Sequence, residues 1–352
     1  MTSQFIAVAA TDCDTPMNLK TLAKSLGLSE TTVSRALNGY PEVSENTRER
    51  VLALARATGY RPNPVARNLA LGRTNMIGVV YPLHPADFGD PMFLEVVAGM
   101  TEALSRQDMD LIIAPVRTDK KLHAYEQLVQ GNRVDGLVVT RTRVHDDRIS
   151  YLTRVQMPFV AYGRTLTEAP YAWFDYDNEV GIRMAAERLM SLGHRRIGFI
   201  GASLDLMSAR QRQQSFIATM QSAGIAPEPA HIVDNAIDKH AGYKAVMRIL
   251  SSSAKPSALI VDNHLAGIGV IRALLDQQVA IGSEMSVIVW GSMEESLIDK
   301  QVSIISQPGT RLAGEKMIEM ILALIDGTPS SELHVLWQPE LIPGETVGHY
   351  RH

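Results

Sequence analysis

The sequence has very little cysteine and no long apolar run. Cys13 is the only cysteine in 352 residues, so no disulfide can form within the chain. That usage fits a reducing compartment. No stretch reaches the 18 or so consecutive apolar residues that a membrane helix requires. The apolar run Phe5–Ala10 is too short for a signal peptide and lacks a basic start. These absences predict a cytoplasmic protein.

Motifs for catalysis, phosphate binding and metal binding are also lacking. The sequence has no GxxxxGK[ST], no GxGxxG that opens a helix, no HExxH and no paired CxxC. The nearest glycine loop, Gly267-Ile-Gly269, lies within a helical pattern and indicates helix packing instead. We therefore predict no catalytic site, no metal and no cofactor, and expect that the protein is not an enzyme.

Charge is distributed unevenly along the chain. The net charge is −4, but residues 18–73 hold nine Lys or Arg and four Asp or Glu, so this segment carries +5 and the remainder −9. A basic segment fused to an acidic body is typical of a DNA-binding domain joined to another function. The length suits two or three domains.

Residues 18–57 have the pattern of three short helices. Asn18, Ser29 and Ser44 can each cap a helix start, and Gly27 suits the left-handed conformation that ends the first helix. The third helix is expected over roughly residues 45–57. Apolar residues at helical spacing form one buried side; they are Leu19, Leu22, Ala23, Leu26, Val33, Ala36, Leu37, Val51, Leu54 and Ala55.

The opposite side of the second helix is polar, as in a recognition helix that enters a major groove. Arg35 could make a bidentate contact with guanine, and Glu30 could accept from a cytosine amino group. Thr31 and Thr32 could reach a base, a thymine methyl or a phosphate. A helical hairpin with an exposed arginine but no DNA contact is the alternative interpretation.

A further short helix, after these three, is expected over residues 63–73. Asn63-Pro64 provides a cap followed by proline at the first helical position. A helix of about seven residues is unstable alone in water, so we expect it to fold against DNA and its twin from a second subunit. Leu69 could enter a minor groove and kink the duplex. A plain linker turn is the alternative.

From Met76 onward, short apolar strands alternate with amphipathic helices. Such strands predict parallel sheets covered on both faces, and two successive series predict two doubly wound lobes. The expected strands are 77–81, 110–114, 136–140, 159–162, 172–174, 196–201, 258–261, 285–290, 303–306 and 341–343, with helices such as Phe93–Gln107, Asn178–Leu192 and Arg311–Ile325.

Polar and aromatic residues directly after these strands predict a ligand site. Open parallel sheets bind ligands at the carboxyl ends of their strands, and two facing lobes would make a cleft there. The mixture of donors, acceptors and aromatic rings suits a polyhydroxylated ligand, with Phe93 and Trp290 able to stack on a sugar face. The predicted ligand-binding residues are Asp90, Phe93, Arg141, Arg164, Arg212, Asn263, Trp290 and Gln307. Each could also be an ordinary loop residue.

The chain resembles the LacI/GalR family of bacterial transcription regulators. The resemblance rests on Ser29–Asn38, Thr47-Arg48, Gly59–Asn63 and Val65–Leu69, and it continues through a core that is similar to sugar-binding proteins, to about residue 348. It implies base reading by Glu30, Thr31 and Arg35, a minor-groove role for Leu69, and sugar contacts by Arg212, Asn263 and Gln307. The full predicted DNA-binding set is Ser29, Glu30, Thr31, Thr32, Arg35, Asn38, Ser44, Tyr60, Asn63, Ala66 and Leu69.

Two departures from the family pattern concern the ligand. The common Asn-Asp pair is Asn263-His264 here, and the common aromatic-Asp-Asp is Trp290-Gly291-Ser292. A carboxylate that often holds sugar hydroxyls is therefore absent. Thr140–Arg143 and Tyr162–Arg164 are similar to family members that respond to disaccharides of the α-glucoside type.

These patterns predict a domain order and a function. We expect a disordered tail (1–17), a helix-turn-helix domain (18–62), a hinge helix (63–73) and a two-lobed effector and dimerisation domain (76–349). The first lobe would comprise about 76–175 plus 305–325, and the second about 177–303 plus 333–345. The expected function is a homodimeric, nucleoid-associated regulator, a repressor released from a pseudopalindromic operator by a sugar. An activator, a co-repressor-dependent regulator and a cytoplasmic sugar-binding protein are the alternatives.

Overall fold

The chain forms two separate compact units, divided between Thr74 and Asn75. A computed structural model describes residues 18–60, 72–82, 91–116, 121–293 and 298–350. The predicted tail and most of the predicted hinge helix therefore lie outside the described residues. No described helix is long and apolar enough to cross a membrane.

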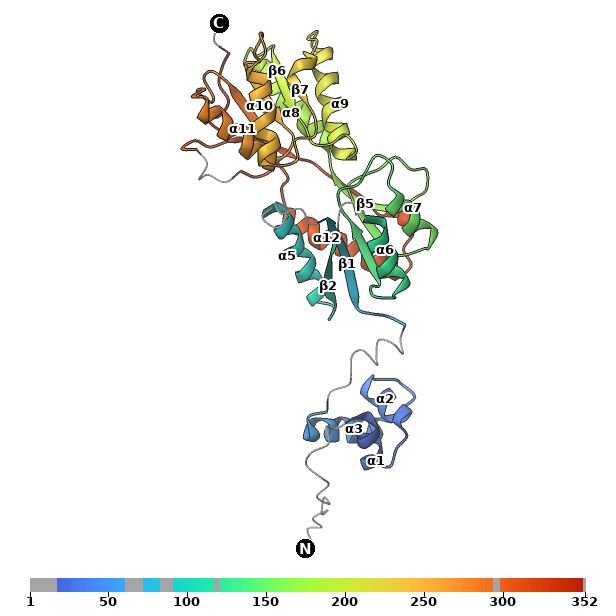
Figure 1. Cartoon of the computed structure of the whole chain (residues 1–352). Coiled ribbons are helices and arrows are strands. Elements are labelled where there is room, and N and C mark those ends of the chain that lie inside the picture. The colour runs from blue at the N-terminus through green and yellow to red at the C-terminus, as the bar shows by residue number, and fades with distance from the viewer. Residues whose placement is uncertain (1–17, 61–71, 83–90, 117–120, 294–297, 351–352) are drawn as a thin grey trace. The chain divides into compact units, whose positions relative to one another are not determined.

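The first unit is a bundle of three helices (Figure 1): α1 (Leu19–Leu26), α2 (Glu30–Leu37) and α3 (Glu45–Thr58). The predicted caps are confirmed. Asn18 Oδ1 accepts from Thr21 N at 2.9 Å, and Ser29 Oγ accepts from Thr32 N at 3.1 Å. Gly27 ends α1 in the left-handed conformation, with a φ of 66°. The core consists of Leu22, Ala23, Val33, Ala36, Val43, Val51 and Ala55.

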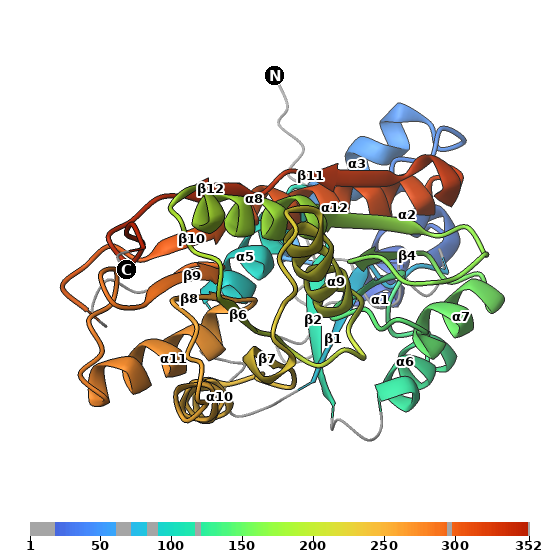
Figure 2. The ribbon, with the colours of Figure 1, turned by 90° about the horizontal axis from the view of Figure 1, so that it is seen from above.

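The second unit contains two six-stranded sheets, each with helices on both faces (Figures 1 and 2). The first sheet has the order β11-β5-β4-β3-β1-β2, and the second β12-β10-β9-β8-β6-β7. The strands are β1 (Met76–Pro82), β2 (Asp110–Val116), β3 (Gly136–Val139), β4 (Phe159–Tyr162), β5 (Ala172–Tyr176), β6 (Ile197–Ile200), β7 (Ile232–Val233), β8 (Ala258–Val261), β9 (Ser286–Trp290), β10 (Ser303–Ser306), β11 (His334–Trp337) and β12 (Glu340–Ile342).

The helices of this unit cover the sheets because their apolar sides complete the cores. They are α5 (Pro91–Ser105), α6 (Lys121–Gln130), α7 (Asp147–Arg154), α8 (Asn178–Ser191), α9 (Met207–Ser222), α10 (Lys239–Leu250), α11 (His264–Asp276) and α12 (Thr310–Ile325). The central strands β3, β6, β8 and β9 are buried along their whole length. This matches the continuous apolar runs that predicted parallel sheets.

The chain crosses between the lobes three times, and the last part of the predicted division is wrong. Helix α12 packs in the core of the first lobe, as expected. The sequence assigned residues 333–345 to the second lobe as one block, but β11 pairs in parallel with β5 of the first sheet. Only β12 belongs to the second sheet, where it pairs antiparallel with β10. The half-buried β11 carries no signal of its partner, because its pairing is set by a strand about 160 residues earlier.

Candidate functional site

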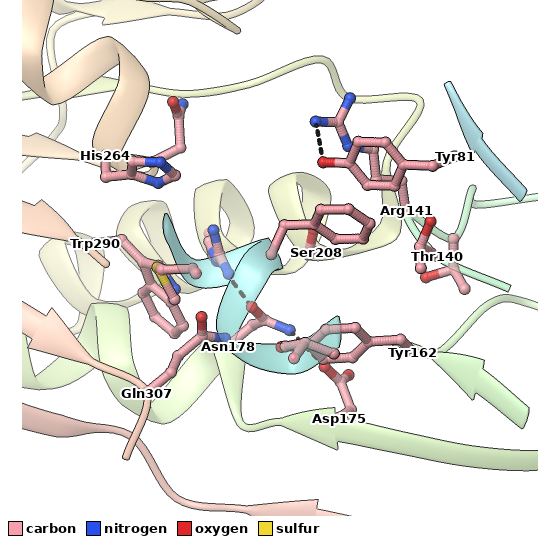
Figure 3. Close-up of a pocket in the computed structure, with 17 residues that line it drawn as sticks. Tyr81, Thr140, Arg141, Tyr162, Asp175, Asn178, Ser208, His264, Trp290 and Gln307 are labelled. Carbon is pink, nitrogen blue, oxygen red and sulfur yellow. Dashed lines mark hydrogen bonds between the residues drawn. The ribbon is translucent and has the colours of Figure 1, made fainter. Parts of the chain in front are cut away.

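A cleft of about 250 Å³ lies between the lobes, at the carboxyl ends of their strands. Figure 3 shows its two walls facing each other, with Tyr81, Thr140, Arg141 and Asp175 on one side and His264 and Trp290 on the other. The first wall comprises Tyr81, Phe93, Thr140, Arg141, Thr142 and Asp175. The second comprises Asn178, Ser208, Arg212, Asn263, His264 and Trp290, and Gln307 lines the cleft from a crossover.

Arg212, on α9, is held in the second wall by two hydrogen bonds within the protein. Its Nε donates to Asn178 Oδ1 at 2.8 Å, and its Nη1 donates to the Asp262 carbonyl at 2.6 Å. Burial lowers the pKa of the Arg212 guanidinium, while nearby Asp262 and Asp175 oppose that shift. A guanidinium has five N–H donors in a fixed plane, so donors remain for a ligand oxygen.

The indole ring of Trp290 packs against the guanidinium of Arg212. The sequence predicts that this ring can stack on a sugar face. The guanidinium lies 3.8 Å from the indole centroid, and Trp290 is only 3% exposed. A Cβ at Gly181 of α8 would collide with the indole, so the glycine is what leaves room for the ring. The indole therefore holds Arg212 by a cation–π contact and does not offer an open face to a sugar.

Asp175 is the acidic group of the first wall. Arg164 Nε donates to its Oδ2 at 2.8 Å, and Asn178 Nδ2 donates to its Oδ1 at 3.3 Å. Burial raises the pKa of the Asp175 carboxyl, and the hydrogen bond from Arg164 opposes that rise. Arg164 is not among the lining residues and pairs with Asp175, so its predicted contact with the ligand stays a prediction.

Asn263 lines the cleft and also caps a helix. Its Oδ1 accepts from Ala266 N at 2.9 Å and so caps α11. Its Nδ2 donates to the Ala236 carbonyl at 2.9 Å and to Asp262 Oδ1 at 2.8 Å. Both amide hydrogens are therefore used within the protein, and only Oδ1 has capacity left for a ligand.

Tyr81 and Phe93 form the aromatic end of the first wall. Their ring centroids lie 3.7 Å apart at an interplanar angle of 23°. Arg141 Nη2 donates to the Tyr81 hydroxyl at 3.3 Å, and the Arg141 guanidinium lies 5.2 Å from the Tyr81 ring centroid. This end thus combines a stacked ring pair with a cation.

The position of the missing family carboxylate is filled by other groups. Gly291 has a φ of 104°, and a Cβ there would lie 3.1 Å from Met92 Sδ and 3.3 Å from His264 Cβ. An aspartate at this position would require both neighbours to move. The glycine at position 291, where the family commonly has aspartate, therefore matches the close packing of Met92 and His264 around it.

The predicted DNA-binding residues of the first unit occupy two kinds of position. Ser29, Glu30, Thr31, Arg35 and Ser44 are exposed, while Thr32, Asn38 and Tyr60 are partly buried. Several also hold the fold, since Ser29 and Ser44 cap helices and Asn38 Nδ2 donates to the Ser34 carbonyl at 2.9 Å. Asn63, Ala66 and Leu69, and Asp90 of the ligand set, lie outside the described residues.

Six lining residues were not singled out by the sequence analysis: Tyr81, Met92, Val96, Asp175, Asn178 and Ser208. Tyr81 lies near the end of its strand, so the rule that selected Arg141 could also have selected it. Asp175 follows the predicted strand 172–174 directly. Ser208 lies in the first turn of α9, four residues before the predicted Arg212 on the same helix, so the prediction for Arg212 could have led to it.

Comparison with known proteins accounts for nearly the whole chain. Residues 74–336 match the family described as periplasmic binding proteins and sugar binding domain of LacI family. Residues 18–63 match the bacterial regulatory proteins of the lacI family. The chain belongs to the LacI family of bacterial regulatory proteins.

Full-length relatives of this LacI-family protein are transcriptional regulators. It is 36% identical over 333 residues to the HTH-type transcriptional regulator RafR of Escherichia coli, covering 94% of this chain and 98% of RafR. It is 32% identical over 337 residues to the HTH-type transcriptional regulator AglR of Rhizobium meliloti (strain 1021), covering 95% of each. Neither is named as an enzyme.

A solved structure supports the fold of the LacI-family core. A transcriptional regulator from Yersinia pestis biovar Microtus str. 91001 is 35% identical and superposes with a TM-score of 0.73, covering 79% of this chain and 100% of that structure. The LacI-family protein is thus a transcriptional regulator with a helix-turn-helix DNA-binding domain and a sugar-binding-type domain.

Proposed function

We propose that this regulator is a homodimeric repressor of carbohydrate-utilisation genes, released from a pseudopalindromic operator when a sugar occupies the cleft. The observation that carries the proposal is the cleft itself, whose walls come from both lobes and present Arg212, Asp175 and Asn178 to one space. A ligand that touches both walls binds best at one lobe angle, and such differential affinity is what couples two sites.

The chemistry of the walls favours a neutral sugar, and we propose a disaccharide or other glucoside. The charges of Asp175 and Arg164 are paired within the protein, so the site offers mainly oriented donors and acceptors. Tyr81, which stacks on Phe93, lies on the opposite side of the cleft from Trp290, which packs against Arg212 (Figure 3). Two ends of different character suit a ligand with two rings. We propose ligand contacts by Phe93, Arg141, Arg212, Asn263 and Gln307.

The proposed DNA contacts are made by the exposed polar side of α2. Arg35 reads a guanine and Glu30 a cytosine, while Thr31 and Thr32 reach a base edge or phosphate. We also propose that Asn63, Ala66 and Leu69 act from the hinge segment and that a second copy provides the other half-site. The regulator would act in the cytoplasm, associated with the nucleoid.

The test is a titration of a labelled upstream DNA fragment with the full-length protein. Glucose, galactose, maltose, sucrose, melibiose, lactose and cellobiose are then added in turn. Release of DNA by at least one sugar supports the proposal, and tighter binding would assign co-repression instead. Arg35→Ala should lower the preference for operator over random DNA by about 1–3 kcal/mol, the value of one bidentate base contact. Its sugar affinity should be unchanged.

A further inference from the structure

The segment Thr140–Val144, here called the cleft loop, follows β3 and forms part of the first wall. Thr140, Arg141 and Thr142 line the cleft. Arg141 has a φ of 51°, in the left-handed region that non-glycine residues rarely adopt. A residue in this conformation persists when its surroundings hold it there. The cleft loop therefore needs a partner behind it.

That partner is Arg148, a residue of α7 that is only 5% exposed. Its Nη1 donates to the Thr140 carbonyl at 3.1 Å, and its Nη2 donates to the Arg141 carbonyl at 3.0 Å. Both carbonyls belong to consecutive residues of the cleft loop. The planar fork of a guanidinium, with five N–H donors, can donate to two such acceptors and to a carboxylate at once.

Asp146 completes the support. It accepts from Arg148 Nε at 2.8 Å and from Arg148 Nη2 at 2.6 Å. It also accepts from Arg143 N, a third residue of the cleft loop, at 2.9 Å. Burial acts to raise the pKa of the Asp146 carboxyl, but the hydrogen bonds and charge of Arg148 outweigh it, so the pKa lies below its usual value. Neither Asp146 nor Arg148 lines the cleft, so both act through the loop.

The same loop is bonded to the other lobe. Val144 N donates to the Asp205 carbonyl at 2.9 Å, and Met207 N donates to the Thr142 carbonyl at 3.0 Å. We call this pair of backbone hydrogen bonds the interlobe strap. Met207 is the first residue of α9, the helix whose Ser208 and Arg212 line the opposite wall. On both lobes, the residues that form the interlobe strap are thus next to, or are themselves, residues that line the cleft.

We propose that Asp146 and Arg148 are positioning residues for effector binding, which hold the cleft loop so that it contacts the sugar and forms the interlobe strap at once. This inference rests on the proposed function. The strap bonds require this arrangement of the lobes, so a ligand on both walls and the strap stabilise the same state. Without the pair, ordering of the loop must accompany binding, which lowers affinity.

The sharpest test compares two substitutions of Met207. Met207→Pro removes the N–H that donates to Thr142, at a helix position that proline tolerates. Leu206, with φ −82° and ψ 131°, already has the extended conformation that precedes proline. Met207→Ala is the matched control, because it loses the same side chain but keeps the N–H. Arg148→Met tests the support itself, against the wild-type protein.

Calorimetric titration with the sugar that releases the wild-type protein from DNA provides the readout. We expect Met207→Pro to bind that sugar at least about tenfold more weakly than Met207→Ala, and Arg148→Met at least about tenfold more weakly than wild type. That ratio corresponds to about 1.4 kcal/mol. Operator affinity without sugar should stay within about threefold, a result that general loss of structure would not give.

Equal affinities within both comparisons would overturn the inference. If Arg148→Met does not fold, as judged by circular dichroism, the comparison at Met207 decides alone. If no sugar of the panel binds the wild-type protein, the proposed function fails separately. Hydrogen exchange of the Val144 and Met207 amides then tests the support without a ligand. Wild-type protection of both amides in folded Arg148→Met would overturn it.

Discussion

Two arginines that line the cleft, one on each wall, are held in different ways. Arg212 of the second wall is fixed by Asn178 and the Asp262 carbonyl and lies over Trp290. Arg141 of the first wall is exposed and donates to the Tyr81 hydroxyl at its tip. Its backbone, by contrast, is held firmly by Arg148. Arg212 of the second wall is therefore fixed at its side chain, and Arg141 of the first wall at its main chain.

This difference suggests where affinity and response are set. A side chain that is already in place when the ligand arrives costs little conformational entropy on binding. A main-chain support instead ties the position of the residue to the lobe arrangement through the interlobe strap. We therefore expect the second wall to dominate affinity and the first wall to report lobe closure.

The largest expected effect is that of Arg212→Ala on the second wall. The substitution removes the donors aimed into the cleft and leaves Asn178 Oδ1 and the Asp262 carbonyl without their present partner. A hydrogen bond to a charged group contributes about 1.5–3 kcal/mol, so sugar affinity should fall by roughly a hundredfold. Calorimetric titration measures the loss.

The control for Arg212→Ala is operator binding without sugar, which should remain normal because the first unit has its own core. The variant should therefore repress and no longer respond. An Arg212→Ala protein that still leaves the operator at wild-type sugar concentrations would contradict both the role of Arg212 and the ranking of the two walls.

The next effect concerns the support of Arg212. Gly181→Ala would place a methyl group against the Trp290 indole, and overpacking of this kind costs about 1–3 kcal/mol. We expect a lower midpoint of thermal unfolding and about tenfold weaker sugar binding, because the indole must shift beneath the guanidinium. Both are read from thermal denaturation and titration of the same sample.

Trp290→Phe, combined with Gly181→Ala, tests whether contact with the indole causes that loss. A phenyl ring lacks the Cζ3 and Cη2 atoms that the new methyl would meet. In the double variant, the cost of Gly181→Ala should therefore shrink, and a double-mutant cycle measures the coupling. Additive losses would show that the glycine matters for another reason.

Short-range features were predictable from sequence, and long-range ones were not. Capping by Asn18, Ser29 and Ser44 depends on residues three positions away, so the helices of the first unit followed from local spacing. The strands of both sheets followed from apolar runs. The partner of β11 depends on a distant strand, which no local pattern encodes.

The same distinction applies to the site. Positions after strands identified Arg141, Arg212, Asn263 and Trp290 as residues of the cleft, because parallel sheets bring these ends together. Their roles depend on side-chain packing between elements. That Arg212 covers Trp290, and that Arg148 holds the cleft loop, therefore became visible only with the structure.

The smallest expected effect is that of Tyr81→Phe on the first wall. Phenylalanine keeps the ring stacked on Phe93 and beneath Arg141 and removes only the hydroxyl that accepts from Arg141. A single hydrogen bond contributes about 0.5–1.5 kcal/mol, so sugar affinity should fall about twofold to tenfold.

Because the main chain of Arg141 stays held by Arg148, the maximal release from operator should be unchanged at saturating sugar. Loss of that maximal response would mean that the Arg141 side chain, and not its main chain, carries the signal between the lobes. Combination with Arg141→Met should add little further loss if the hydroxyl acts through that arginine.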